Sequence, residues 1–498
     1  MTSPKQRKIS TSVLHRTGII DIGSNTVRLV VFEGPSRSPR YFYNEKVNCG
    51  LGVGLLNTKR LNPKGVRKTI KALRRFKSII AEMNLKQFYC IATAAVRESV
   101  DGSQFVNQLE EQFRIKIWVV SGEEEGNLAA SGVLMGWPEA SGIVCDIGGA
   151  SLELAYLNSG MIQESQSFGL GPLTLNDYQQ VGKVQANIIY ENLSLMKEGF
   201  PNIIEDLFLV GGCWRALARI HMNINDYPLK VLQGYKISVD SLNETMDFIS
   251  SSKISILAKT TSSSMDRLEL LPNAIKVLQA LINRFKPKSI IFSGYGIREG
   301  FFYKQFSSEI REMQPLLEAC KYLENTRARF PGFGEALYDW LRPIVPDINE
   351  INGRLYLAAC YLHDTIWQAH PDYRSEVCFE TVTGANLGGI DHEGRVFLAL
   401  SLMSRYKRTN LNNVNKDMLD LLDQNTIRKA MILGASMRLG SMLSVTVASN
   451  LKKTKIFLEG KNICLSLREK DNFLGETVEK RLSYLAQLMD LNPKIIVE

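Results

Sequence analysis

Short apolar runs alternate with longer stretches of helical spacing through the first 305 residues of the chain. This alternation predicts strands and helices in turn, and hence mixed sheets covered by helices. The order restarts after Gly136-Trp137-Pro138, which indicates two α/β domains of like topology at residues 1–136 and 137–306. Strands are predicted at Gly18–Asp21, Val27–Phe32, Arg40–Cys49, Phe88–Ala92, Ile115–Val120, Gly142–Asp146, Leu152–Leu157, Met161–Phe168, Leu207–Val210 and Ser289–Ser293, and helices at Asn62–Met83, Asp101–Phe113, Glu123–Met135, Pro172–Leu195, Arg215–Met222, Val239–Ser250, Asp266–Phe285 and Ile297–Phe306.

The pattern changes in the last part of the chain. From about residue 307 the apolar positions follow helical spacing, and few strand signals occur before the short region Lys455–Leu467. We therefore expect a separate, mostly helical domain at 307–498, with a possible small α/β tail from about residue 415.

Two glycine-rich turns follow apolar strands, and the second repeats the first 125 residues later. Asp21–Asn25 ends one strand and Asp146–Ser151 ends the other, and a further strand follows each turn. Glycine lets backbone N–H groups approach an oxyanion closely, and the leading aspartate can hold a divalent cation nearby. A single turn of this kind is more often an ordinary hairpin, but two copies facing one cleft form a phosphate clamp.

Six motifs occur in a fixed order: DIGSN at Asp21–Asn25, ATAAVRE at Ala92–Glu98, SGEEEG at Ser121–Gly126, DIGGASLEL at Asp146–Leu154, GGCWRALA at Gly211–Ala218 and SGYGIREG at Ser293–Gly300. Together they resemble the exopolyphosphatase/guanosine pentaphosphate phosphohydrolase family, within the actin, hexokinase and Hsp70 superfamily. The resemblance implies an α/β fold of two actin-like (ribonuclease H-like) lobes followed by a mostly α-helical, HD-like C-terminal domain.

The resemblance makes Glu125 the general base that activates a water, with Glu124 as the second choice and Arg97 as a group that stabilises transition-state charge. The residues alone leave another interpretation open. Acids at a helix start favour the helix dipole without any catalytic role, and Arg97 has Glu98 or Glu110 as possible ion-pair partners.

The resemblance also implies that Asp21 and Asp146 position Mg²⁺, largely through water, and that Glu153 binds the metal or its water. Turn capping by the aspartates and a cross-strand contact for Glu153 are the structural alternatives. Ala150 departs from the glycine usual in the family, which predicts a slightly tighter turn. The expected phosphate-binding residues are Ser24, Asn25, Gly148, Gly149, Ser151, Gly211, Gly212 and Arg298, the last of which is either structural or phosphate-facing.

Charge changes this picture only modestly. The net charge is +9, and residues 306–498 are balanced, so the whole excess lies in residues 1–305. The helix predicted at Asn62–Met83 carries a basic stripe between Lys59 and Lys77 with no acid before Glu82. Such a face is usually only solvated, and the alternative is that it guides a polyanion.

Composition indicates the compartment. The apolar runs are too short to span a membrane, and the basic N-terminal tail around Lys5 and Arg7 has no apolar region after it. The eight cysteines form no CxxC pair and suit buried positions in a reducing compartment. We expect a cytoplasmic protein with no membrane or nucleic-acid partner, and the resemblance suggests a homodimer.

His363-Asp364 resembles the core dyad of an HD metal-phosphohydrolase domain. No histidine lies between His221 and His363, and the spacing of His370, His392 and Asp391 does not supply the missing ligand. We expect a remnant of that fold without a metal.

These observations predict an exopolyphosphatase that uses Mg²⁺ and water to release terminal orthophosphate from inorganic polyphosphate. Guanosine pentaphosphate is the rival substrate and would use the same residues. A slow sensor that binds polyphosphate or an alarmone is the alternative from another class of protein. The glutamates where a water-activating base belongs argue against a kinase.

Overall fold

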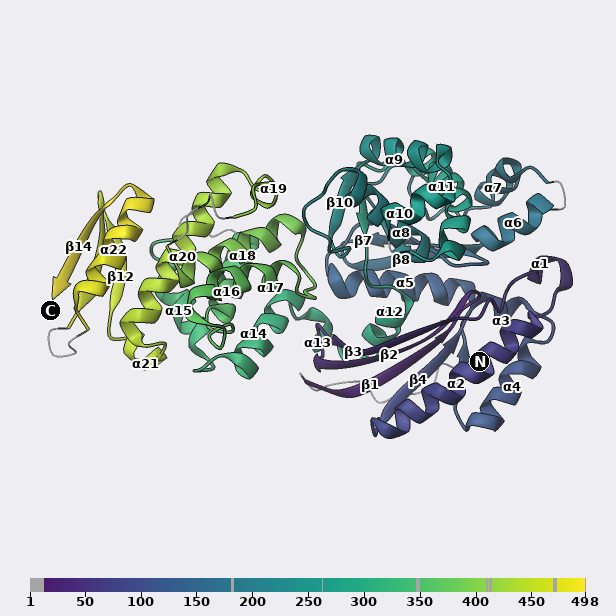
Figure 1. Ribbon diagram of the computed structural model, residues 1–498, viewed down its shortest axis with the longest axis horizontal. Coiled ribbons are helices and arrows are strands. Elements are labelled where there is room, and N and C mark those ends of the chain that lie inside the picture. The colour runs from purple at the N-terminus through teal and green to yellow at the C-terminus, as the bar shows by residue number, and fades with distance from the viewer. Residues whose placement is uncertain are drawn as a thin grey trace. The chain divides into compact units, whose positions relative to one another are not determined.

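The computed structural model describes residues 13–180, 183–261, 263–345, 350–408, 411, 414–468 and 473–497 (Figure 1). The chain divides into two compact units, Met1–Met313 and Gln314–Glu498. The basic tail around Lys5 and Arg7 lies outside the described residues.

The first unit contains two sheets built to one plan. The first has the order β3-β2-β1-β4-β5 and the second β10-β11-β9-β6-β7-β8. In each, the strand before the glycine-rich turn pairs antiparallel with the next strand along the chain and parallel with a later one. The strands are β1 (Val13–Ile22), β2 (Thr26–Pro35), β3 (Arg40–Asn48), β4 (Gln87–Ala92), β5 (Ile117–Val119), β6 (Gly142–Ile147), β7 (Leu152–Asn158), β8 (Met161–Phe168), β9 (Asp206–Gly211), β10 (Tyr235–Ser238) and β11 (Ser289–Phe292).

Helices cover both faces of each sheet, and α5 and α12 lie between the sheets (Figure 1). The α5 residues Leu128 and Met135 join a core with the first sheet, while Ala129 and Val133 join a core with the second. This explains why α5 is apolar on nearly all sides. The helices are α1 (Leu55–Thr58), α2 (Pro63–Glu82), α3 (Ala94–Glu98), α4 (Gly102–Phe113), α5 (Gly122–Gly136), α6 (Pro172–Gln180), α7 (Gln185–Ser194), α8 (Gly212–Ile224), α9 (Val239–Ser251), α10 (Ile254–Thr260), α11 (Met265–Phe285), α12 (Ile297–Lys304) and α13 (Ser308–Glu312).

The second unit is mostly helical and ends in a small sheet of order β12-β13-β14. One apolar core joins its helices to this sheet. Its elements are α14 (Pro315–Arg327), α15 (Phe333–Leu341), α16 (Glu350–Leu362), the 3-10 helix η1 (Pro371–Tyr373), α17 (Arg374–Thr383), α18 (His392–Tyr406), α19 (Lys416–Leu419), α20 (Gln424–Ser444), α21 (Ala448–Leu451), β12 (Lys455–Glu459), β13 (Asn462–Leu467), α22 (Glu476–Met489) and β14 (Asn492–Val497).

The fold class predicted from the sequence is confirmed, with corrections to single elements. The prediction of one helix over Pro172–Leu195 is wrong, because α6 ends at Gln180 and α7 begins at Gln185. The short strands β10 and β14 were not anticipated, since a few residues at a sheet edge carry little pattern. All eight cysteines are buried with free thiols. None of the described helices combines the length and apolar character that a membrane span requires.

Candidate active site

The two glycine-rich turns have the same local structure. The N–H of Gly23 donates to the carbonyl of Thr26 at 2.9 Å, and the N–H of Gly148 donates to that of Ser151, also at 2.9 Å. Each turn leaves the carboxyl end of a central strand, β1 or β6, which has one antiparallel and one parallel neighbour. The repeat in sequence is therefore a repeat in backbone geometry.

The turns face each other closely across one cleft. A Cβ atom placed on Gly149 would lie 3.3 Å from the Cβ of Ser24. The cleft has a volume of about 180 Å³. Its lining residues are Asp21, Gly23, Ser24, Asn25, Thr26, Arg28, Lys46, Thr93, Ala94, Glu125, Asp146, Ile147, Gly148, Gly149, Ser151, Val210, Gly211, Gly212, Cys213, Arg215, Arg267, Leu270, Gly296, Ile297 and Arg298.

All but three of the residues predicted to form the site line this cleft. The exceptions are Arg97, Glu124 and Glu153, which are not among the lining residues. Glu124 forms a capping box: its carboxylate accepts from the N–H of Ser121 at 2.9 Å, and its own N–H donates to the Ser121 hydroxyl at 3.1 Å. This places Glu124 in the helix cap and leaves Glu125 as the acid of that run that lines the cleft.

Glu125 is buried at the start of α5 and is held by Arg97. Arg97 Nη1 donates to Glu125 Oε2 at 2.9 Å and to the carbonyl of Val120, also at 2.9 Å. The weaker pair between Arg97 and Glu98 spans 3.4 Å. Burial raises the pKa of Glu125 to about 7, against the lowering effect of Arg97. The carboxylate is thus fixed in orientation and protonates more readily than an exposed glutamate.

Two more carboxylates oppose each other across the β6–β7 ladder. Asp146 pairs with Glu153 in the register, and Ser167 donates to Glu153 Oε1 at 2.9 Å. Glu153 Oε2 is buried and has no hydrogen-bond partner. Burial raises the pKa of both groups, that of Asp146 to about 8, and the charge of Glu125 acts in the same direction.

This donor set fits a Mg²⁺ ion. Mg²⁺ binds through one or two carboxylates, keeps several waters and takes its other ligands from phosphate oxygens. No cluster of three or more acidic, histidine or cysteine side chains ready to chelate a metal is found in the described part of the chain. Asp146 and the unpartnered oxygen of Glu153 offer such a sparse set, and a bound cation would favour the charged forms that burial disfavours.

Arg298 connects α12 to the first turn. Its Nη1 donates to Asp21 Oδ2 at 2.8 Å, and only 12% of its side chain is exposed. Burial raises the pKa of Asp21, and Arg298 opposes that rise. Arg298 therefore does both things left open by the sequence: it holds Asp21, and it lines the cleft.

A basic wall of the cleft was missed by the sequence analysis. It consists of Arg28, Lys46, Arg215 and Arg267. Burial lowers the pKa of Lys46 to about 8, and the charge of Arg267 adds to this effect. Two of the four had a readable signal: Arg28 lies seven residues after Asp21, as Glu153 lies seven after Asp146, and Arg215 lies within the GGCWRALA motif. Lys46 and Arg267 come from separate elements that meet only in the fold.

Glycines make room for this arrangement at the start of α8. Gly211 has a φ of +121°, and a Cβ there would lie 3.0 Å from Asp146 Oδ1. A Cβ on Gly212 would lie 3.1 Å from Arg267 Nε. Side chains at either position would crowd groups that line the cleft.

The basic stripe on α2 does not line the cleft. Its Arg75 donates to Glu45 Oε1 on β3 at 2.7 Å, and Lys77 donates to the carbonyl of Phe113. Part of the stripe thus has structural partners, and a role in guiding a polyanion stays a prediction.

Comparisons with known proteins agree with this geometry. Residues 30–309 match the profile of the Ppx/GppA phosphatase family, and residues 316–496 match that of the exopolyphosphatase C-terminal domain. The chain is 25% identical over 458 residues to Retrograde regulation protein 2 of Saccharomyces cerevisiae, covering 82% of this chain and 75% of that protein.

It is 24% identical over 292 residues to guanosine-5'-triphosphate,3'-diphosphate pyrophosphatase of Aeromonas salmonicida, covering 57% of this chain and 58% of that protein. The crystal structure of an exopolyphosphatase from Cytophaga hutchinsonii superposes with a TM-score of 0.51 at 21% identity. That superposition covers 58% of this chain and 97% of the other, and it supports the fold of the first unit.

Proposed function

The chain belongs to the Ppx/GppA phosphatase family, and from that premise we propose that it is an exopolyphosphatase. In this proposal a Mg²⁺-dependent hydrolysis releases the terminal orthophosphate of inorganic polyphosphate in the cleft between the two turns. Membership in a phosphatase family supports the class of reaction, and the choice of substrate is our inference.

The basic wall of the cleft is the observation that favours polyphosphate as the substrate. Arg28, Lys46, Arg215 and Arg267 line the cleft together with Arg298, and no aromatic side chain stands among its described lining residues. A chain of phosphoryl groups needs positive charge along its path, which these side chains supply. A guanine base is commonly held by stacking on an aromatic side chain, and the described lining of this cleft has none.

The chemical step is assigned to Glu125. Its carboxylate lines the cleft and is oriented by Arg97, so it can accept a proton from a water that attacks the terminal phosphorus. Arg97 acts through Glu125 as a positioning residue. Ser24 and Gly149 line the cleft from the two turns, and their backbone N–H groups would suit the oxygens of the terminal phosphoryl group.

A Mg²⁺ ion would be held by Asp146, with Asp21 and Glu153 nearby, and would supply positive charge to the oxygens of the bond that breaks. The buried carboxylates would gain from such a charge, because burial and, after it, the neighbouring negative charges raise their pKa values.

The proposal is tested by orthophosphate release from long-chain polyphosphate and from guanosine pentaphosphate, measured side by side with Mg²⁺. We expect faster release from polyphosphate, and a loss of that preference when Lys46→Ala and Arg267→Ala are combined. Preference for the nucleotide in the wild-type protein would contradict the choice of substrate and leave the hydrolase intact.

A sensor is the second candidate, because the relative that covers 82% of this chain is a regulation protein by name. A sensor would bind polyphosphate in the same cleft and release almost no phosphate. Equal, very slow release from both substrates, together with tight binding, would favour it over the enzyme. The homodimer and the cytoplasmic location stay predictions.

A further inference from the structure

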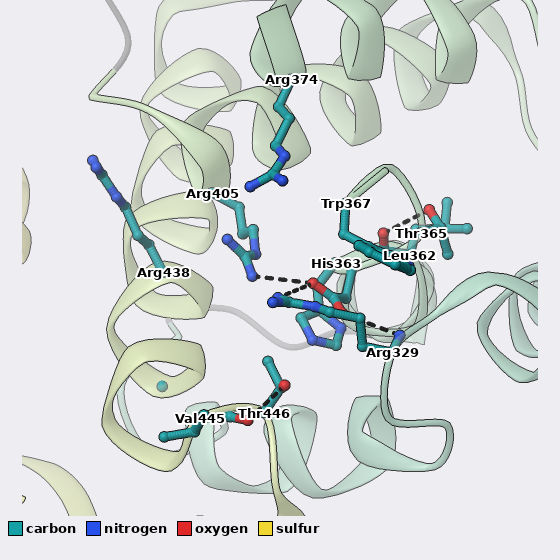
Figure 2. Close-up of polar contacts among 12 residues, drawn as sticks. Arg329, Leu362, His363, Thr365, Trp367, Arg374, Arg405, Arg438, Val445 and Thr446 are labelled. Carbon is teal, nitrogen blue, oxygen red and sulfur yellow. Dashed lines mark hydrogen bonds and ion pairs between the residues drawn. The ribbon is translucent and has the colours of Figure 1, made fainter. Parts of the chain in front are cut away.

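The HD-like dyad of the C-terminal unit lies among arginines. His363 and Asp364 follow α16 and are fully buried, while Arg329 comes from the loop before α15 and Arg405 from α18. Figure 2 shows Arg329, Arg405 and His363 converging on one place, with the guanidinium of Arg374 pointing toward Arg405.

Arg329 binds the carboxylate of Asp364, which a metal ion at the dyad would need as a ligand. Its Nε and Nη2 donate to the two oxygens of Asp364 at 2.9 and 2.7 Å, and its backbone N–H adds a contact of 3.3 Å. His363 Nδ1 bonds the carbonyl of Cys360 at 2.8 Å, and burial lowers the pKa of the ring to about 3, which keeps it neutral. The carboxylate of the dyad thus binds a guanidinium, where a metal ion would otherwise bind.

The positive charge at this place exceeds what Asp364 can balance. Arg405 Nη2 lies 3.6 Å from the Asp364 oxygen that Arg329 already contacts. Its side chain is 12% exposed, and its Nε is buried without a hydrogen-bond partner, as is His363 Nε2. A buried guanidinium with an unmet donor is costly unless an acceptor reaches it.

Arg481 adds to the excess. Arg481 on α22 donates to the carbonyl of Arg438 on α20 at 3.2 Å. Burial lowers the pKa of Arg481 to about 10, and the charges of Arg438 and Arg405 add to that shift. Among the described residues, Asp364 is the one carboxylate with a recorded ion pair to these side chains. We call Arg329, Arg405 and Arg481 the arginine cluster.

We propose that the arginine cluster is a second anion site, which binds a phosphoryl group through guanidinium donors beside Asp364. The planar fork of arginine matches phosphate oxygens in geometry, and a doubly charged phosphoryl group balances charges that one carboxylate leaves over. The partly exposed Arg329 (43%) gives access from solvent. Free orthophosphate and the end of a condensed phosphate chain share this chemistry.

The test is calorimetric titration of the full chain with orthophosphate and, separately, with tripolyphosphate, in EDTA to prevent hydrolysis. Arg405→Gln and Arg481→Gln are compared with Arg342→Gln, which removes a charge from an exposed side chain of the same unit. We expect two binding events in the wild-type protein; the one at the cluster should be at least tenfold weaker in the first two variants, while the one in the cleft of the first unit stays unchanged, and both should be unchanged in the third variant.

Melting curves show which variants fold. If Arg405→Gln does not fold, the comparison of Arg481→Gln with the wild-type protein tests the proposal. Binding of both ligands at the cluster points to free phosphate as a natural occupant, whereas binding of tripolyphosphate alone points to a chain end. Equal affinity in Arg481→Gln, Arg342→Gln and the wild-type protein would place all binding in the cleft of the first unit and overturn the proposal.

Discussion

The crossing of α5 and α12 sets the distance between the base and the first turn. A Cβ on Gly132 of α5 would lie 2.4 Å from the carbonyl oxygen of Gly296, which precedes α12. Glu125 stands on the first turn of α5, and Arg298, which holds Asp21, stands on the first turn of α12. Any separation of the helices therefore moves the catalytic carboxylate relative to the first phosphate-binding turn.

The effect of Gly132→Ala follows from this distance. An ordinary contact begins near 3.4 Å, so the helices must part by about 1 Å, a misplacement that costs about 100-fold in rate when reacting groups are involved. Overpacking costs about 1–3 kcal/mol of stability, and alanine returns ~1 kcal/mol as the better helix former. The variant should therefore fold, with a modestly lower melting temperature.

Orthophosphate release and a melting curve measured on the same preparation test this reasoning. Gly169→Ala is the matched control, because a Cβ there meets nothing within 4 Å. We expect a rate loss of about two orders of magnitude in Gly132→Ala and none in the control. A folded Gly132→Ala protein with wild-type release would refute the view that the crossing positions the site.

Three further outcomes are expected. Arg97→Gln should lower kcat by about tenfold to 100-fold with little change in KM, because Arg97 orients Glu125 and does not line the cleft; an effect on KM alone would contradict this. Arg267→Gln should raise KM for polyphosphate more than for guanosine pentaphosphate, and an equal rise for both would deny the basic wall a role in substrate choice. The KM for polyphosphate should rise as pH passes about 8, because Lys46 loses its proton and positive charge there. Lys46→Arg should remove that rise, and identical pH profiles of KM in the variant and the wild-type protein would refute this role of Lys46.

The features that could be predicted from the sequence are those contained in short contiguous segments. The turns at Asp21–Asn25 and Asp146–Ser151 and the acid at Glu125 lie in short contiguous motifs, and the structure brings them to one cleft. The capping role of Glu124 was also readable as an alternative, since Ser121 stands three residues before it.

What the sequence did not predict arises from tertiary convergence. Lys46 and Arg267 come from β3 and α11 and share no motif. The contact between Arg329 and Asp364 joins residues 35 positions apart, so no short sequence motif predicts it. The break between α6 and α7 falls in a stretch whose helical spacing continues across it.

The central claim is that Glu125 performs hydrolysis in a cleft that binds condensed phosphate through other residues. Its most direct test is Glu125→Gln, assayed for orthophosphate release with Mg²⁺ and for polyphosphate binding at equilibrium. We predict a loss of release of at least about 100-fold with binding within a few-fold of the wild-type protein. Release that persists in Glu125→Gln, or binding that falls in step with it, would contradict the account.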